Sequence, residues 1–111
     1  NIKLSVISGT IQEYVEKNGY SVVRNYTGHG VGRCMHEDPQ VPNFVNDSLL
    51  AADEILMSGV TIAIEPMICM GTPDTEVLSN KWTVVTKDRK LSAHFEHTIV
   101  VTEDGADILT K

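Results

Sequence analysis

Four polar residues lie in sequence surroundings where an ordinary hydrophobic core would not place them. His29 sits inside residues 28–32, where glycine occupies every second position, and His36 follows seven residues later. Glu65 interrupts an apolar run rich in β-branched residues, and Glu96 lies on an alternating stretch near the end of the chain. Imidazoles and carboxylates are the side chains that most often bind metal ions or transfer protons.

The acid inside the apolar run, Glu65, suggests which chemistry this set could perform. Burying a carboxylate without a partner costs on the order of several kcal/mol, and a bound metal ion would offset the desolvation of both carboxylates. One histidine with two carboxylates suits a divalent ion such as manganese, iron, cobalt or zinc. Such an ion polarises a carbonyl and lowers the pKa of bound water, which is hydrolase chemistry, and the second histidine could then act on substrate.

Each residue taken singly also has a plain structural interpretation. Either histidine could be an ordinary loop or surface residue that bonds to backbone or water. Glu65 could reach solvent where Pro66 ends the strand, and Glu96 could form an ion pair with Lys81 or Arg89 across a sheet. The residue types alone therefore leave both interpretations open.

The elements that would position these residues are one helix and several short strands. An amphipathic helix is predicted near the amino terminus by the spacing of Ile7, Ile11, Tyr14 and Val15, and Gly19 supplies its stop. Strands are predicted over residues 20–25, 60–70, 82–86, 94–102 and 106–109, with a hairpin turn at 103–105. Residues 27–32 around His29 and residues 71–80 are predicted to be loops, and residues 37–47 an extended connection at the surface. The predicted class is α+β, a single domain over residues 1–111 with a mostly antiparallel sheet.

Composition narrows the range of partners. The formal net charge of −6 and the scattered basic residues argue against a nucleic-acid surface. No apolar run approaches the length of about 20 residues that spans a bilayer. Cys34 and Cys69 are too few and too far apart for a disulfide framework, so we expect two reduced thiols in a cytoplasmic protein. The chain starts at Asn1 with a helical pattern almost at once, which suggests a piece of something longer.

Three sequence blocks, read together, resemble the signatures of type I, bacterial-like methionine aminopeptidases. The blocks are YTGHGVGR at residues 26–33 with HEDPQV at 36–41, IEPMI at 64–68, and WTVVTKDR at 82–89 with LSAHFEHTI at 91–99. They stand in the family's order, and the resemblance covers roughly residues 11–109. It implies half of the "pita-bread" fold of creatinases and aminopeptidases, this chain being the carboxyl-terminal catalytic half.

The resemblance also implies roles for the four polar residues. His29, Glu65 and Glu96 would be metal ligands, and Glu96 would bridge the two divalent ions of the intact enzyme. His36 would contact the scissile peptide, and Glu65 would shuttle protons to the leaving amine. The implied reaction is metal-dependent removal of the initiator methionine from the N-terminus of nascent proteins.

Three further positions bear on the substrate pocket and on the surroundings of the ligands. Trp82 resembles a residue near the methionine pocket. Met35 stands where the family commonly has an aromatic residue, and Met fills space without fixing it. His94 stands where the family usually has glutamine, and it could hydrogen-bond a ligand.

The family's two aspartate ligands and a further histidine come from an amino-terminal half that nothing in this chain resembles. We therefore expect at most one weakly bound metal ion and no appreciable peptidase activity from this chain alone. Its partners would be Met-peptide substrates and either the missing half or a second copy of itself.

The alternative is a non-catalytic pita-bread module that binds peptides or proteins, although such modules usually lose the metal ligands that are kept here.

Overall fold

The computed structural model describes all 111 residues, and every strand pairing in it is antiparallel. The two helices are α1 (Leu4–Lys17) and α2 (Asp47–Ala51). The strands are β1 (Ile2–Lys3), β2 (Ser21–Val22), β3 (Gly28–Gly30), β4 (Glu37–Val41), β5 (Ile55–Leu56), β6 (Thr61–Ile64), β7 (Met67–Cys69), β8 (Thr75–Val77), β9 (Val84–Thr86), β10 (Ser92–His94), β11 (His97–Val101) and β12 (Ala106–Ile108). The α+β class and the antiparallel sheet are confirmed.

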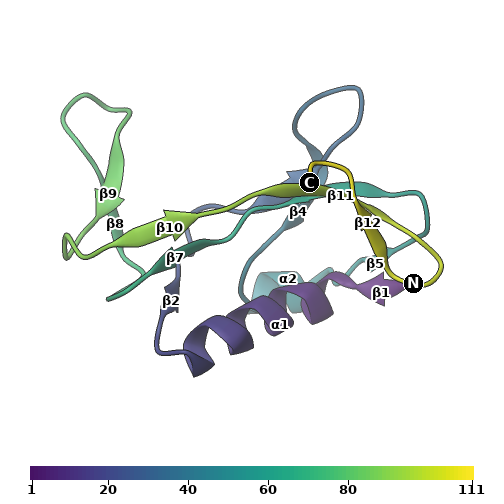
Figure 1. Cartoon of the computed structure of the whole chain (residues 1–111), viewed down its shortest axis with the longest axis horizontal. Coiled ribbons are helices and arrows are strands. Elements are labelled where there is room, and N and C mark those ends of the chain that lie inside the picture. The colour runs from purple at the N-terminus through teal and green to yellow at the C-terminus, as the bar shows by residue number, and fades with distance from the viewer.

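Two sheets form the body of the molecule. The larger has the order β12-β11-β6-β3-β4 and the smaller the order β10-β7-β2, while β8-β9 and β1-β5 are separate two-stranded pairs. A long ribbon joins the two sheets, because β6 runs into β7 and β10 runs into β11 (Figure 1). Helix α1 crosses one side of this ribbon. The β8-β9 hairpin and the connection between β3 and β4 project from the other side (Figure 1).

Helix α1 follows the predicted stripe only in part. Leu4 and Val15 are buried, but Tyr14, a member of the predicted apolar face, is 72% exposed. At the start of the helix, the carboxylate of Asp53 accepts the Ser5 backbone N–H at 2.9 Å, a capping role taken by a residue distant in sequence. Gly19 follows the helix at φ +82°, the left-handed conformation that favours glycine at this position, so the predicted stop is confirmed.

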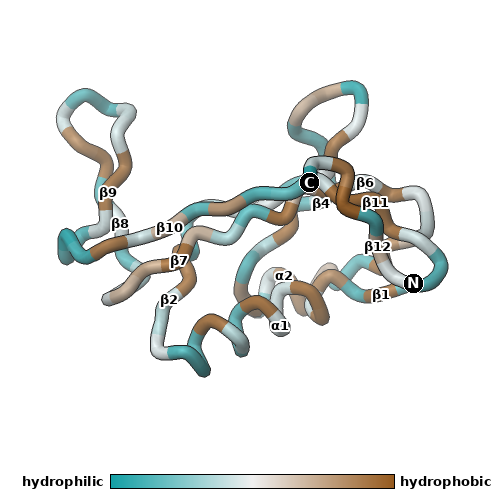
Figure 2. Tube along the Cα trace, viewed as in Figure 1, coloured by the Kyte–Doolittle hydropathy of each residue, from teal (hydrophilic) through white to brown (hydrophobic).

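The core lies between α1, α2 and the larger sheet. Its buried apolar side chains are Leu4, Val41, Leu49, Leu56, Ile62 and Val101, with Ile64 and Ile99 packed against them at its edge. Apolar residues accordingly recur along α1 and along the strands that it covers (Figure 2). Neither helix combines the length and the apolar character needed to cross a bilayer.

Several predicted loops contain regular structure. Residues 28–30 form β3, so His29 lies on a paired strand and not in a loop. Residues 37–47 were expected at the surface, but they contain β4, and Asn43 and Phe44 in this segment are buried. Helix α2 was also missed; the Asn46 side chain caps it by accepting the Leu49 N–H at 2.7 Å. Residues 71–80 include β8, and the predicted strand 94–102 is broken between β10 and β11.

Candidate metal centre

The two carboxylates occupy a shared break in the ribbon that joins the two sheets. Register pairs Ile64 with His97 on one side of the break and Met67 with His94 on the other. Continuing this register places Glu65 directly opposite Glu96, and Pro66 opposite Phe95. Pro66 has no N–H to donate, and a single long backbone bond, from Phe95 N to Pro66 O at 3.4 Å, crosses the break. The sequence thus interrupts both strands at the same level and leaves two acids face to face.

The third candidate ligand comes from the neighbouring strand. β3 pairs with β6 so that His29 lies opposite Ala63, two residues before Glu65 and hence on the same face of the sheet. The glycines on either side of His29 permit this approach. A Cβ on Gly28 would overlap the carbonyl oxygen of Ala63, and one on Gly30 would overlap the carbonyl of Asp38 on β4.

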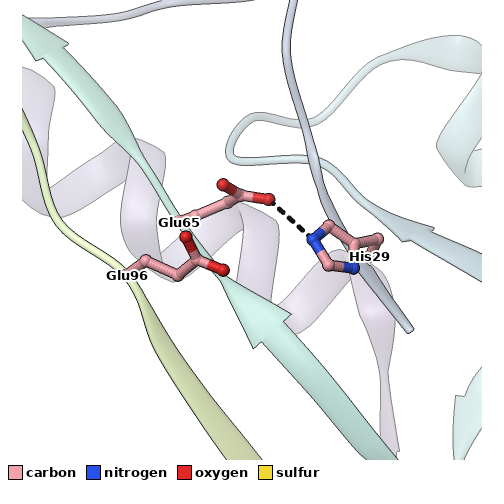
Figure 3. Close-up of side chains that lie close together, drawn as sticks. All are labelled: His29, Glu65 and Glu96. Carbon is pink, nitrogen blue, oxygen red and sulfur yellow. Dashed lines mark ion pairs between the residues drawn. The ribbon is translucent and has the colours of Figure 1, made fainter. Parts of the chain in front are cut away.

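The three side chains converge on one point (Figure 3). One ligand atom from each of His29, Glu65 and Glu96 lies within 4.8 Å of the other two. His29 Nε2 is 3.1 Å from Glu65 Oε1, and both side chains are largely buried. The other ring nitrogen, Nδ1, lies 2.9 Å from the carbonyl oxygen of Gly30, to which it donates its proton. In the neutral ring this leaves the lone pair of Nε2 facing Glu65.

The electrostatics of this arrangement call for a positive charge between the three groups. Two carboxylates directly opposite each other on paired strands repel. The lone pair of His29 Nε2 faces a Glu65 oxygen, so a proton or a cation must separate these two acceptors. One imidazole and two carboxylates form a donor set that suits a divalent ion of intermediate hardness. The residues present therefore fit a metal ion.

His94 and His36 flank the cluster. His94 Nε2 lies 3.4 Å from Glu65 Oε2, the oxygen that His29 does not contact, so His94 stands where it can orient that carboxylate.

The ring of His36 packs against the ring of His29, with 4.2 Å between the centroids. Both rings line an open hollow of about 520 Å³, whose other lining residues, Thr27, Glu37, Asp38 and Gln40, are all polar. This hollow could not be predicted from the sequence, because its members are ordinary polar residues brought together only by the pairing of β3 with β4.

Met35 and Trp82 are not part of the cluster. Met35 lies in the connection between β3 and β4 and is 72% exposed, and Trp82 lies in the β8-β9 hairpin and is 86% exposed. These are the two segments that project from the side of the ribbon opposite α1 (Figure 1). The core face of the ribbon, which carries Ile62 and Ile64, is the α1 side, so Glu65 points to the same side as the two projections.

The ion pairs that were the structural alternative for Glu96 are absent. Arg89 instead pairs with Glu76, and neither Lys81 nor Arg89 forms an ion pair with Glu96.

Comparisons with known proteins bear on the family to which this chain belongs. The family model described as "Metallopeptidase family M24" matches residues 1–103. The chain is 51% identical over 108 residues to the methionine aminopeptidase of Clostridium perfringens, and 50% identical over 109 residues to methionine aminopeptidase 1 of Bacillus subtilis. These matches cover 97% and 98% of this chain, but only 42% and 43% of the relatives.

Solved structures give the same result. The crystal structure of the Thermotoga maritima methionine aminopeptidase superposes with a TM-score of 0.91 at 50% identity, covering 99% of this chain and 43% of the other. That of the Rickettsia prowazekii enzyme gives 0.87 at 45% identity, covering 98% and 43%. The present chain thus spans less than half of the length of the relatives that it matches. Since the family model covers almost the whole chain, and the fold and sequence agree with it, the chain belongs to metallopeptidase family M24.

Proposed function

We propose that this chain forms the carboxyl-terminal half of the active site of a methionine aminopeptidase, which removes the initiator methionine from the N-terminus of nascent proteins. The observation that supports this most is the convergence of His29, Glu65 and Glu96 from three adjacent strands onto one point. Identity near 50% to named methionine aminopeptidases supports the substrate class.

In this proposal, His29, Glu65 and Glu96 would hold the metal, and Glu96 would also serve a second ion in an intact enzyme. A divalent ion bound here would polarise the scissile carbonyl and lower the pKa of water. With such an ion bound, Glu65 would be the residue to hold the proton of the attacking water and pass it to the leaving amine, because it lies at the centre of the cluster. His94, beside the second oxygen of Glu65, limits the rotation of this carboxylate.

His36 acts on the substrate in this proposal. Its ring packs at a tilt against the ring of His29, so it lies one side chain away from the proposed metal position, where a peptide carbonyl or nitrogen would lie. Trp82 and Met35, on the two segments that project from the same side of the ribbon, would line the methionine pocket once that space is enclosed.

Three protein donors are enough for one ion but not for two. The open positions on the first ion would be filled by water, and a second ion would be held by Glu96 alone. We therefore propose weak binding of a single ion, with manganese, cobalt, iron and zinc all compatible with the donors. The remaining ligands would come from residues outside this chain, in an amino-terminal half or a second copy.

The cell compartment that we propose is the cytoplasm. Cys34 is an exposed free thiol and Cys69 a buried one, a state that a reducing compartment preserves.

Calorimetric titration of Mn²⁺ and Co²⁺ into the metal-free chain tests the site. We expect one weak site that disappears in Glu96→Ala, while Glu13→Ala, which removes an exposed acid from α1, leaves it unchanged. A site that survives Glu96→Ala would contradict the proposal. Methionine release from a Met-Ala-Ser peptide by the chain alone, at a rate near that of an intact enzyme, would disprove the half-site interpretation.

A further inference from the structure

The segment that follows β12 is bonded to β11 next to the candidate ligand Glu96. The Thr98 backbone N–H donates to Thr110 Oγ1 at 3.0 Å, and the Leu109 N–H donates to the Thr98 carbonyl at 2.9 Å. Thr110 Oγ1 also lies 3.0 Å from His97 Nδ1. A hydroxyl has one proton and two lone pairs, so Thr110 can satisfy both groups at once. Figure 1 shows the carboxyl end of the chain beside β11 as a result.

These contacts lie on the opposite face of the strand from the candidate metal centre. Side chains alternate along β11, so Phe95 and His97 share one face and Glu96 points to the other. The Phe95 and His97 rings meet edge to face, with 5.0 Å between centroids. Thr110, His97 and Phe95 thus form a continuous chain of contacts behind the backbone that carries Glu96.

Glu96 itself has little else to fix it. Its side chain is exposed and forms no ion pair or side-chain hydrogen bond, whereas Glu65 contacts both His29 and His94. It also sits in the break between β10 and β11, where a single 3.4 Å bond crosses to the other strand. The direction of the Glu96 carboxylate therefore depends on how firmly the backbone of the next residue, His97, is held.

We propose that Thr110 is a positioning residue for the metal site, acting through His97 to hold Glu96 in line with His29 and Glu65. This inference rests on the proposed function, because it assigns Glu96 as a metal ligand. A hydrogen bond one step behind a ligand typically changes metal affinity by about 10- to 100-fold when it is lost. Thr110 acts through a neighbour of the ligand, so we expect a smaller loss, about 3- to 10-fold.

The experiment compares three variants by Mn²⁺ calorimetry and by amide NMR of the metal-free chain. Thr110→Val keeps the shape of the side chain but removes the hydroxyl, and it should weaken Mn²⁺ binding about 3- to 10-fold. Thr110→Ser retains the hydroxyl and should restore affinity to within about twofold of the parent. Thr10→Val removes a threonine hydroxyl that bonds within α1, far along the chain from the site, and should change nothing.

The NMR measurement separates this inference from the proposed function. In metal-free Thr110→Val we expect shifted Glu96 and His97 amide signals and faster hydrogen exchange at Thr98. Unchanged signals at these three residues would overturn the inference, whether or not the chain binds metal. Equal Mn²⁺ affinity of Thr110→Val and the parent would also overturn it, while leaving the Glu96→Ala test of the metal site intact.

Discussion

The Glu96→Gln variant should be more stable than the parent when no metal is present, and less stable than the parent when metal is bound. Without metal, the Glu65 and Glu96 carboxylates face each other with oxygens no more than 4.8 Å apart. Two unit charges at that distance repel by about 1 kcal/mol in a water-like dielectric and about 3.5 kcal/mol at an effective dielectric of 20. Because Glu96 is exposed, the lower value applies, and neutralising it should stabilise the metal-free chain by about 1 kcal/mol.

Metal binding should change the sign of this difference. At a concentration 100 times its Kd, an ion stabilises the folded state by about 2.7 kcal/mol, and Glu96→Gln would lose most of this because it removes a ligand. Thermal unfolding followed by circular dichroism, at low ionic strength and about pH 8, provides the assay. In a chelator the midpoint of Glu96→Gln should exceed that of the parent by about 4 °C, and in excess Mn²⁺ it should be the lower of the two.

The control for this experiment is Glu13→Gln, which changes the net charge equally from an exposed position on α1. It should shift the midpoint only slightly, and by the same amount with and without metal. If Glu96→Gln unfolds at or below the parent in the chelator, the two carboxylates do not repel as their register implies. That result would refute the reasoning from the shared break.

Two further predictions concern the scaffold. Gly30→Ala should lower the free energy of unfolding, measured in urea, by about 1–3 kcal/mol, because the added Cβ would overlap the Asp38 carbonyl. As a control, Gly9→Ala within α1 should raise the free energy of unfolding by about 0.5–1 kcal/mol, because there the added Cβ makes ordinary contact. The Ser5 hydroxyl, followed by the Ser5 backbone N–H, lowers the pKa of Asp53 below its ordinary value of 3.8. The charged carboxylate therefore stabilises the fold at any pH above the pKa that Asp53 has in the unfolded chain. This stabilisation is lost as the pH falls through the lower pKa that Asp53 has in the folded protein. The melting temperature of Asp53→Asn should therefore lie below that of the parent at pH 6 and approach it near pH 2.

The candidate ligand set could be predicted from the sequence because its residues violate the rules that govern a core. Glu65 stands out as an acid in an apolar strand, and Pro66 marks the place where that strand must break. The alternation of apolar and polar residues over 94–102 also predicted the face of the sheet on which Glu96 lies, because the strand register continues through the break. What the sequence could not show is that both breaks fall at the same level, because that depends on the pairing of distant segments.

Local composition was misleading where tertiary contacts decide the structure. Glycines on both sides of His29 favour a loop, but here they let β4 and β6 approach β3 closely enough to pair. Residues 37–47 look like a surface connection because they are rich in proline and asparagine. They nevertheless contain β4 and the cap of α2, and Asn46 followed by Leu49 was the available signal for that helix. Trp82 shows the reverse case, a large aromatic residue left exposed.

The shared break between β6–β7 and β10–β11 also constrains how this family can change in length. Inserting one residue into either strand alone would shift its register and turn every following side chain to the opposite face. Glu65 and Glu96 would then lie on different sides of the sheet, even though neither residue had been altered. We therefore expect an insertion or deletion within the ribbon to keep both acids on one face only if the other strand changes by the same number of residues or a bulge absorbs the difference. The strand register thus couples the positions of Glu65 and Glu96, which are far apart in the sequence.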